Sequence, residues 1–191
     1  LSFGKKEKKM GWNSQHTAMV HFDECRIPIE NLVGQEGDGF KIAMAGLDGG
    51  RVNIAACSVG GARAAMELSI AYAQERKQFG NAISHFQSIQ FKLADMATEL
   101  ETARLMVYRA AKSLGNADVE ATMHCAMAKR WATEIGSKVC NEALQIHGGY
   151  GYLKDFPIEK LVRDLRVHQI LEGTNEIMQS IIAKRLLDPK A

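Results

Sequence analysis

The sequence predicts an all-α protein, an antiparallel four-helix-type bundle preceded by a short β segment. Three observations favour this fold class. After residue 39, apolar residues recur at steps of three and four in long stretches, as on one face of a helix. Short loops join these stretches, which favours antiparallel neighbours. Alternation of β-forming residues is confined to 1–34. We therefore expect two parts, 1–34 as the tail of a β-domain and 35–191 as a helical bundle domain.

The β segment is predicted from residues 17–29, which alternate in polarity and are rich in strand-forming types before Pro28. This pattern indicates one or two strands and a turn. So few strands do not make a stable sheet by themselves. We therefore interpret 1–34 as the end of a β-domain whose main part lies outside this sequence.

The first helical region is predicted in two pieces. Residues 40–47 indicate a short helix, which Asp48-Gly49-Gly50 interrupts, and the helical pattern resumes over 51–76. The pair Gly60-Gly61 either weakens the second piece or permits close packing. Residues 77–83 then indicate a loop.

The clearest helix follows this loop. Ser84 to Gln87 fit a capping box, in which the Ser and Gln side chains bond to each other's backbone N–H groups. Gly115 is expected to end the helix in the left-handed conformation. Between these points runs one continuous apolar stripe, made of Phe86, Ile89, Leu93, Met96, Leu100, Ala103, Val107, Ala110 and Leu114.

The remaining helices are predicted from their start signals. The glycine-rich run 148–151 is expected to exclude regular structure and to allow close approach of the backbone. The three helices are a long one over 118–146 capped by Asp118, a short one over 157–165 beginning at Pro157, and a last one to Leu187 capped by Thr174 or Asn175.

The bulk composition excludes several classes. The chain has 191 residues, of which 46% are hydrophobic and 24% charged, as in an ordinary globular domain. A net charge of +2 does not favour nucleic acid, and the basic run 5–9 indicates a solvated loop or a contact with an anionic ligand. The sequence contains no run of 18 apolar residues, so no membrane-spanning helix is predicted. The four cysteines form no C-x-x-C pair, which argues against a metal site. Cys125 and Cys140 lie in helical patterns and are expected to be buried thiols.

Glu172 is the first candidate for chemistry. It stands between the apolar pair Ile170-Leu171 and Gly173, just before a helix start. An apolar setting raises the pKa of a carboxyl group and makes it a better base near neutral pH. A helix start also offers free backbone N–H groups to polar ligand atoms. The alternative is a glutamate that only ends a helix in solvent.

Two further connections are candidate ligand sites. The glycines of Gln145 to Gly149 would let a flat ring or a phosphate lie against the backbone, or they only stop a helix. In 76–80, Arg76 and Lys77 stand at a helix end, where cations favour the dipole without any ligand. The same place suits a pyrophosphate, for which Arg offers a bidentate fork.

Four segments, in their order along the chain, resemble the acyl-CoA dehydrogenase family. They are 75–80 (Glu-Arg-Lys-Gln-Phe-Gly), 145–151 (Gln-Ile-His-Gly-Gly-Tyr-Gly), 163–164 (Arg-Asp) and 171–177 (Leu-Glu-Gly-Thr-Asn-Glu-Ile). The resemblance covers nearly all 191 residues. Segments 2–14 and 46–51 look most like the members that act on short, branched acyl thioesters. By this resemblance, 1–34 ends a middle β-domain and the rest is the carboxy-terminal four-helix domain.

The resemblance implies an activity for the parent protein, although the isolated chain is expected to be inactive. Glu172 would remove the α-proton of an acyl-CoA thioester while the β-hydrogen leaves as hydride to FAD. Some relatives carry the base just before the residue that matches Arg51. Gly50 occupies that position here, which supports Glu172 as the base.

The same comparison implies further site residues and partners. Asp48, Arg51 and Gly173 would contact substrate. Electron-transfer flavoprotein would accept electrons, and the subunits would form a homodimer or homotetramer. The compartment would be the mitochondrial matrix in a eukaryote or the cytoplasm in a bacterium. FAD would be bound by Arg76, Gln78, Phe79, Gln87, Gln145, Ile146, His147, Gly148, Gly149, Thr174, Asn175 and Glu176, with 145–149 serving the flavin of a neighbouring subunit.

Two alternatives stay open at this point. A related acyl-CoA oxidase would use the same residues but pass electrons to oxygen. A non-catalytic helical module, kept for subunit assembly, would need the bundle but not Glu172.

Overall fold

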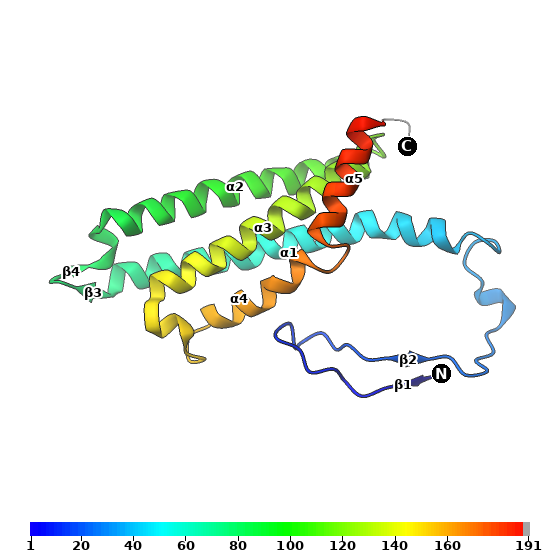
Figure 1. Ribbon diagram of the computed structural model, residues 1–191, viewed down its shortest axis with the longest axis horizontal. Helices are drawn as coiled ribbons and strands as arrows, with labels where there is room; N and C mark the ends of the chain where they lie inside the picture. Colours follow the sequence, from blue (N-terminus) through cyan, green and yellow to red (C-terminus); the bar gives the residue numbers. More distant parts are fainter. Residues whose placement is uncertain (189–191) are drawn as a thin grey trace.

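The computed structural model describes residues 1–188 and confirms an all-α bundle with a short β leader. Three long helices lie side by side, the second running opposite to the first and third, and two shorter ones complete the bundle (Figure 1). They are α1 (Gly39–Glu75), α2 (Gln87–Gly115), α3 (Ala121–His147), α4 (Ile158–Arg166) and α5 (Asn175–Leu187).

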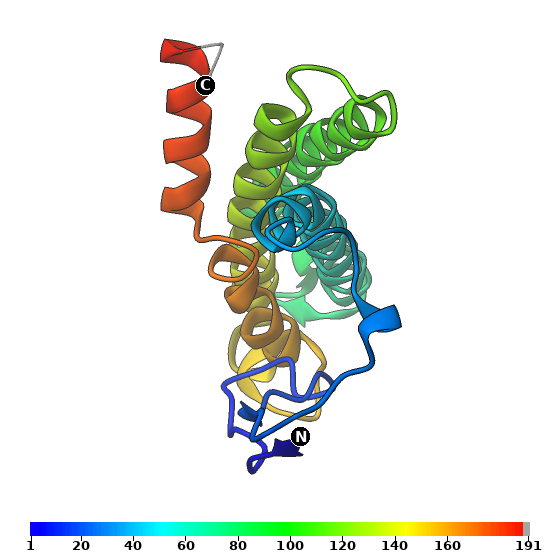
Figure 2. The same cartoon turned by 90° about the vertical axis from the view of Figure 1, so that its right-hand side faces the viewer.

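Helix α3 is the centre of the bundle because it contacts each of the other four helices. Figure 2 shows α5 standing to one side, beside α3 and away from α2. Most of the buried residues along α1 are Ala or Ser, so the backbones of α1 and α3 approach closely. On α2 the predicted stripe is confirmed, because its central members are buried against α3: Met96, Leu100, Ala103, Val107 and Ala110.

The predicted break in the first helix is wrong, since α1 continues through Asp48-Gly49-Gly50 without interruption. Glycine lowers helix propensity, but packing against the rest of a protein supplies most of a helix's stability. Asp48 also pairs with Arg51 one turn later, with 2.6 Å between carboxylate and guanidinium. Gly50 therefore does not end or interrupt α1.

The predicted capping box is also wrong. Ser84 lies in a 3₁₀ turn, η2 (Ile83–His85), and α2 begins at Gln87 without a side-chain cap. A short hairpin, β3 (Lys77–Gln78) with β4 (Asn81–Ala82), replaces the predicted loop and sets the direction in which the chain enters α2. Its two central residues, Phe79 and Gly80, both have positive φ, as a two-residue hairpin turn requires.

The predicted ends around the α2–α3 connection differ as well. Gly115 is the last helical residue, and the left-handed residue of this loop is Ala117 with φ 53°. The residue that precedes α3 is Glu120, not Asp118, and its side chain makes no cap hydrogen bond. Backbone hydrogen bonds close the loop instead, such as Ala121 N–H to the carbonyl of Asp118 at 3.0 Å. They satisfy groups that a side-chain cap would otherwise reach.

Later boundaries agree more closely with the sequence. Pro157 directly precedes α4, and Thr174 caps α5 by accepting from the N–H of Ile177 at 3.4 Å. The run 148–151 was expected to be irregular, but it forms most of a 3₁₀ helix, η3 (Gly148–Tyr152). That turn is compact because Gly151 is packed against the carbonyl of Leu144, where no Cβ would fit.

The leader forms one two-residue ladder and then docks on the bundle. Strand β1 (Ser2–Phe3) pairs antiparallel with β2 (Val20–His21), and a 3₁₀ turn, η1 (Ile29–Asn31), follows. Between the strands, the N–H of Trp12 donates to Asp164 Oδ1 of α4 at 2.5 Å. Figure 2 shows the leader passing the α4 end of the bundle. The division at residue 34 stays a prediction.

Helix α1 is also notable for its apolar composition. Among residues 1–188 it is the one helix that is long and apolar enough to cross a bilayer, judged by length and composition alone. This is weak evidence of insertion, because core helices of bundles share the property and α1 packs along α2 and α3. The expectation of no membrane insertion stays a prediction.

Candidate active site

Glu172 lies in a tight left-handed turn between η4 (Val167–Gln169) and α5. Its φ is +56° and that of Gly173 is +89°. A non-glycine residue in this region costs on the order of 1–3 kcal/mol and persists only where the surroundings impose it. The turn therefore holds the Glu172 side chain in a direction that a relaxed loop would not maintain.

The Glu172 carboxylate rests on the face of α1 at Gly50. A Cβ placed on Gly50 would lie 2.3 Å from Glu172 Oε2, which is a collision. Glycine at position 50 therefore makes room for the acid. The same carboxylate lines a cavity of about 630 Å³ whose walls include Ile54, Trp12 and Leu171. The cavity is also lined by Lys9, Arg163 and Arg166. A partly buried acid at the wall of a cavity large enough for a ligand is placed as a general base would be.

Lys129 of α3 holds this turn in place through hydrogen bonds. The sequence alone did not predict a role for this residue. Its ammonium donates to the carbonyl of Gly173 at 2.7 Å and to Asn175 Oδ1 at 3.0 Å. The Asn175 amide in turn donates to Thr133 and Glu134. A signal was available, because Lys129 stands on the buried face of α3 between alanines, where a charged residue needs a partner.

Asp48 and Arg51 lie together in a different cavity, of about 390 Å³. Asp48 joins Arg51 through one oxygen and accepts from the Thr122 hydroxyl at 2.7 Å through the other. Arg51 is only 7% exposed, and its Nε has no hydrogen-bond partner in the described part of the chain. Lys184 and Arg185 complete a basic rim. The predicted substrate pair is thus brought together, but in a cavity separate from that of Glu172.

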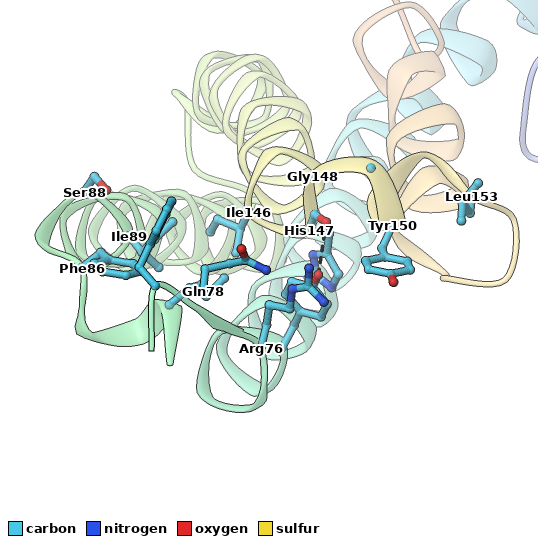
Figure 3. A pocket seen from close by; sticks show the side chains of 14 residues that line it. Arg76, Gln78, Phe86, Ser88, Ile89, Ile146, His147, Gly148, Tyr150 and Leu153 are labelled. Atoms are coloured by element: carbon cyan, nitrogen blue, oxygen red, sulfur yellow. Dashed lines mark hydrogen bonds between the residues drawn. The ribbon is translucent and has the colours of Figure 1, made fainter. Parts of the chain in front are cut away.

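A third cavity, of about 560 Å³, lies at the β3–β4 end of the bundle and joins two of the predicted ligand segments. Figure 3 shows side chains from both segments facing the same space, with Arg76 beside the ring of Tyr150. The guanidinium carbon lies 5.4 Å from the ring centre. Seven predicted cofactor residues line the cavity, namely Arg76, Gln78, Phe79, Ile146, His147, Gly148 and Gly149.

The other predicted cofactor residues lie elsewhere. Gln87 and Gln145 are exposed and do not line this cavity. Thr174, Asn175 and Glu176 lie at the start of α5, next to Glu172. Among these three, Asn175 is buried in the Lys129 network, whereas Glu176 is exposed. The exposed first turn of α5 is therefore the surface that a ligand near Glu172 could reach.

The cavity at the β3–β4 end fits one end of a dinucleotide such as FAD. A Cβ placed on Gly148 or Gly149 would meet no atom within 4 Å, so the backbone there is open to a flat group. Apolar side chains including Tyr72, Phe86 and Ile89 form the walls, and Arg76 supplies a cation for a phosphate. The cavity thus offers apolar surface to a ring and a cation to a phosphate.

This cavity is far from Glu172. Gly50, against which Glu172 rests, and Arg76 are at opposite parts of the uninterrupted helix α1. At the rise of an α-helix they are separated by about 39 Å along the axis. An extended FAD molecule is shorter than this distance. One bound molecule could not fill the cavity and also reach the Glu172 carboxylate of the same chain.

The helical architecture is that of the carboxy-terminal domain of a flavoprotein dehydrogenase. The family pattern "Acyl-CoA dehydrogenase, C-terminal domain" matches residues 37–187, and the chain belongs to the acyl-CoA dehydrogenase family. The mitochondrial isobutyryl-CoA dehydrogenase of Bos taurus is 54% identical over 187 residues, which cover 98% of this chain and 45% of that protein. The chain therefore spans less than half the length of this relative.

Solved structures agree with this assignment. Butyryl-CoA dehydrogenase from Megasphaera elsdenii matches with a TM-score of 0.95 and 44% identity, covering 97% of this chain and 48% of that one. An acyl-CoA dehydrogenase from Bacillus anthracis complexed with FAD matches with a TM-score of 0.92 and 34% identity, covering 97% and 35%. A chain in a structure of the electron transferring flavoprotein of Acidaminococcus fermentans matches at 0.95 and 45%, covering 98% and 49%. Members of the family are FAD-dependent.

Proposed function

We propose that the protein carrying this chain is a flavin-dependent acyl-CoA dehydrogenase in which Glu172 removes the α-proton of the substrate. The observation that carries this proposal is the Glu172 carboxylate, held in a strained turn against Gly50 and lining a cavity whose walls combine apolar side chains with the cations Lys9, Arg163 and Arg166. Strain at a non-glycine residue marks functional sites more often than ordinary loops. The glycine at position 50, whose Cβ would collide with that carboxylate, supports the same role.

The chemistry requires three things of this chain. The α-proton of a thioester is weakly acidic, so the base must be positioned and water must be excluded. Leu171 and Ile54 line the same cavity as the carboxylate and, with substrate bound, would help to exclude water there. The backbone N–H of Glu172 is suited to hydrogen-bond the thioester oxygen as negative charge develops on it. FAD, when bound, accepts the β-hydrogen as hydride.

FAD would contact the chain in two places. Arg76 would bind a phosphate through its guanidinium, with the adenine end against Gly148 and Gly149. The exposed start of α5, at Thr174 and Glu176, would face the flavin end. Because about 39 Å separates the two places along α1, they would serve two different FAD molecules. Each FAD would then lie between two subunits, which favours a homodimer as the smallest active unit.

The substrate we propose is a short, branched acyl-CoA thioester, with isobutyryl-CoA favoured. The support is the 54% identity with isobutyryl-CoA dehydrogenase over nearly the whole chain. One methyl group is worth only about 1–3 kcal/mol of discrimination, so neighbouring acyl chains will compete. Turnover of the full-length protein with isobutyryl-, 2-methylbutyryl-, butyryl- and isovaleryl-CoA would rank them. A higher kcat/KM for butyryl- than for isobutyryl-CoA would overturn this choice.

The proposed electron acceptor is an electron-transfer flavoprotein, which the similarity to the Acidaminococcus fermentans structure supports. The alternative is an oxidase that passes electrons to oxygen. Steady-state turnover of the full-length protein with and without oxygen, in the presence of the flavoprotein, separates the two. Turnover that stops without oxygen would show an oxidase.

The role of Glu172 is tested by Glu172→Gln in the full-length protein. The amide has the same shape but cannot accept the proton, so we expect kcat to fall by roughly 10²–10⁴-fold with little change in KM. Glu67→Gln on the exposed face of α1 is the control and should leave kcat unchanged. Turnover of Glu172→Gln within a few-fold of the parent would favour a non-catalytic assembly module instead.

A further inference from the structure

Lys129 is a fully buried lysine that the proposed chemistry does not use. It lies in the first half of α3 with 0% exposure, and its neighbours one turn away on that face are Cys125, Ala126, Ala132 and Thr133, none of them charged. A lysine in such a position is costly unless its charge is paired or hydrogen-bonded. Its presence in the core therefore calls for a reason beyond packing.

The hydrogen bonds of Lys129 go to the turn that carries Glu172. The ammonium donates to the carbonyl of Gly173 at 2.7 Å, directly after the base. It also donates at 3.0 Å to Asn175 Oδ1, at the first residue of α5. One cation thus ties together both sides of the left-handed turn. Charge-assisted hydrogen bonds of this kind are roughly twice as strong as neutral ones.

The charges around Lys129 come from three helices and the turn before α5. Burial lowers the pKa of Lys129 to about 8, against the attraction of Glu176 on α5, Glu134 on α3 and Glu172 in the turn, while Arg51 on α1 lowers it further. The network is closed by Thr133, whose hydroxyl lies 3.1 Å from Asn175 Oδ1. The ammonium therefore carries its charge at neutral pH and loses it in mildly alkaline solution.

We propose that Lys129 is the positioning residue that holds the left-handed turn at 172–173 and so orients the Glu172 carboxylate toward substrate. This inference rests on the proposed role of Glu172. Because Lys129 is fully buried, it acts through the carbonyl of Gly173 rather than by direct contact with a ligand. A misplacement of about 1 Å at a reacting group can cost 10²-fold in rate, so a loosened turn is enough to impair catalysis.

The first test compares Lys129→Met with the parent, both as full-length holoprotein. Methionine keeps the length of the stem but has no charge and no N–H donor. We expect kcat to fall roughly 10- to 100-fold while KM and FAD content stay within two-fold. Lys138→Met, on the exposed side of the same helix, is the matched control and should leave kcat unchanged. An unchanged kcat in folded Lys129→Met would overturn the inference.

The second readout does not depend on turnover. Amide hydrogen exchange of peptides that cover 171–175 should become faster in Lys129→Met and stay as in the parent in Lys138→Met and Glu172→Gln. Equal exchange in all four proteins would overturn the inference. If Glu172→Gln left turnover intact while Lys129→Met loosened the turn, the proposed function would fail but the anchoring role would stand.

Lys129→Gln and the pH profile cover the case in which Lys129→Met does not fold. Glutamine keeps a donor without the charge, so its kcat should lie between those of the parent and Lys129→Met. In the parent, kcat should decline as pH rises through about 8, because the ammonium is lost. Stability should not decline with it. The folded pKa lies below the ordinary 10.5, so this group favours the folded state increasingly between pH 8 and 10.5. A parent kcat that stays flat through this window would count against the inference.

Discussion

At the scale of single residues, the absence of a side chain at Gly50 makes room for the Glu172 carboxylate. The sequence around Gly50 would ordinarily weaken a helix, yet the helix is continuous and the missing side chain is where the carboxylate lies. The cost to the helix is roughly 0.5–1 kcal/mol relative to alanine. The chain thus trades a small amount of helix stability for the room that the acid requires.

Gly50→Ala should therefore separate stability from activity. The clashing atom is the free end of a flexible side chain, so the carboxylate would move and the helix would persist. We expect the free energy of unfolding to rise by up to about 1 kcal/mol while kcat falls at least ten-fold. Thermal unfolding and steady-state kinetics on the full-length protein measure both.

The neighbouring glycine provides the control for this substitution. A Cβ on Gly49 would meet no atom within 4 Å. Gly49→Ala should give the same gain in helix stability and leave kcat unchanged. If both variants kept full activity, Glu172 would not need its place against α1.

At the scale of the elements, small residues let α1, α3 and α4 converge. A Cβ on Gly61 of α1 would lie 2.6 Å from Leu165 Cδ1 of α4, and one on Gly136 of α3 would lie 3.1 Å from Ser58 Cβ of α1. The pair Gly60-Gly61 therefore permits close packing through its second member. Helix α4 carries Arg163 and Asp164, so this packing also determines where the leader docks.

Adjacent glycines in α1 should respond in opposite ways. The added methyl group would overpack the buried Leu165 side chain, so Gly61→Ala should destabilise the fold by about 1–3 kcal/mol. Gly60→Ala adds a methyl group in open space and should stabilise by roughly 0.5–1 kcal/mol. Urea unfolding of the two variants, compared at equal m-values, checks the sign. Equal effects would mean that α4 does not pack against this face.

At the scale of the whole molecule, the two proposed FAD contacts are at opposite parts of α1. If each FAD lies between two subunits, Glu172 from one chain and Arg76 from its partner form one site. Two inactive variants should then complement each other. Mixed dimers of Glu172→Gln and Arg76→Ala chains contain one site with both residues intact.

Co-expression of the two differently tagged variants tests this arrangement. We expect purified mixed dimers to recover turnover toward half of the parent value, although each variant alone is impaired at all sites. Dimers of two Glu172→Gln chains are the control and should stay inactive. If mixed dimers were no more active than the mean of the two homodimeric variants, each site would be built from a single chain.

The sequence by itself determined the helical fold, the apolar stripe of α2, a cap of α5 at Thr174 or Asn175, and the family, because these depend on local periodicity and motif. It did not determine the continuous α1, the start of α2 at Gln87 or the left-handed residue at Ala117, because packing and backbone hydrogen bonds outweigh local propensity.

Only the tertiary structure brought Arg76 and His147 into one cavity, separated them from Glu172, and seated that carboxylate on Gly50. It also gave Lys129 its partners. These relations join residues far apart in the chain. Their cause is the close contact of α1, α3 and the turn before α5, which no local pattern records.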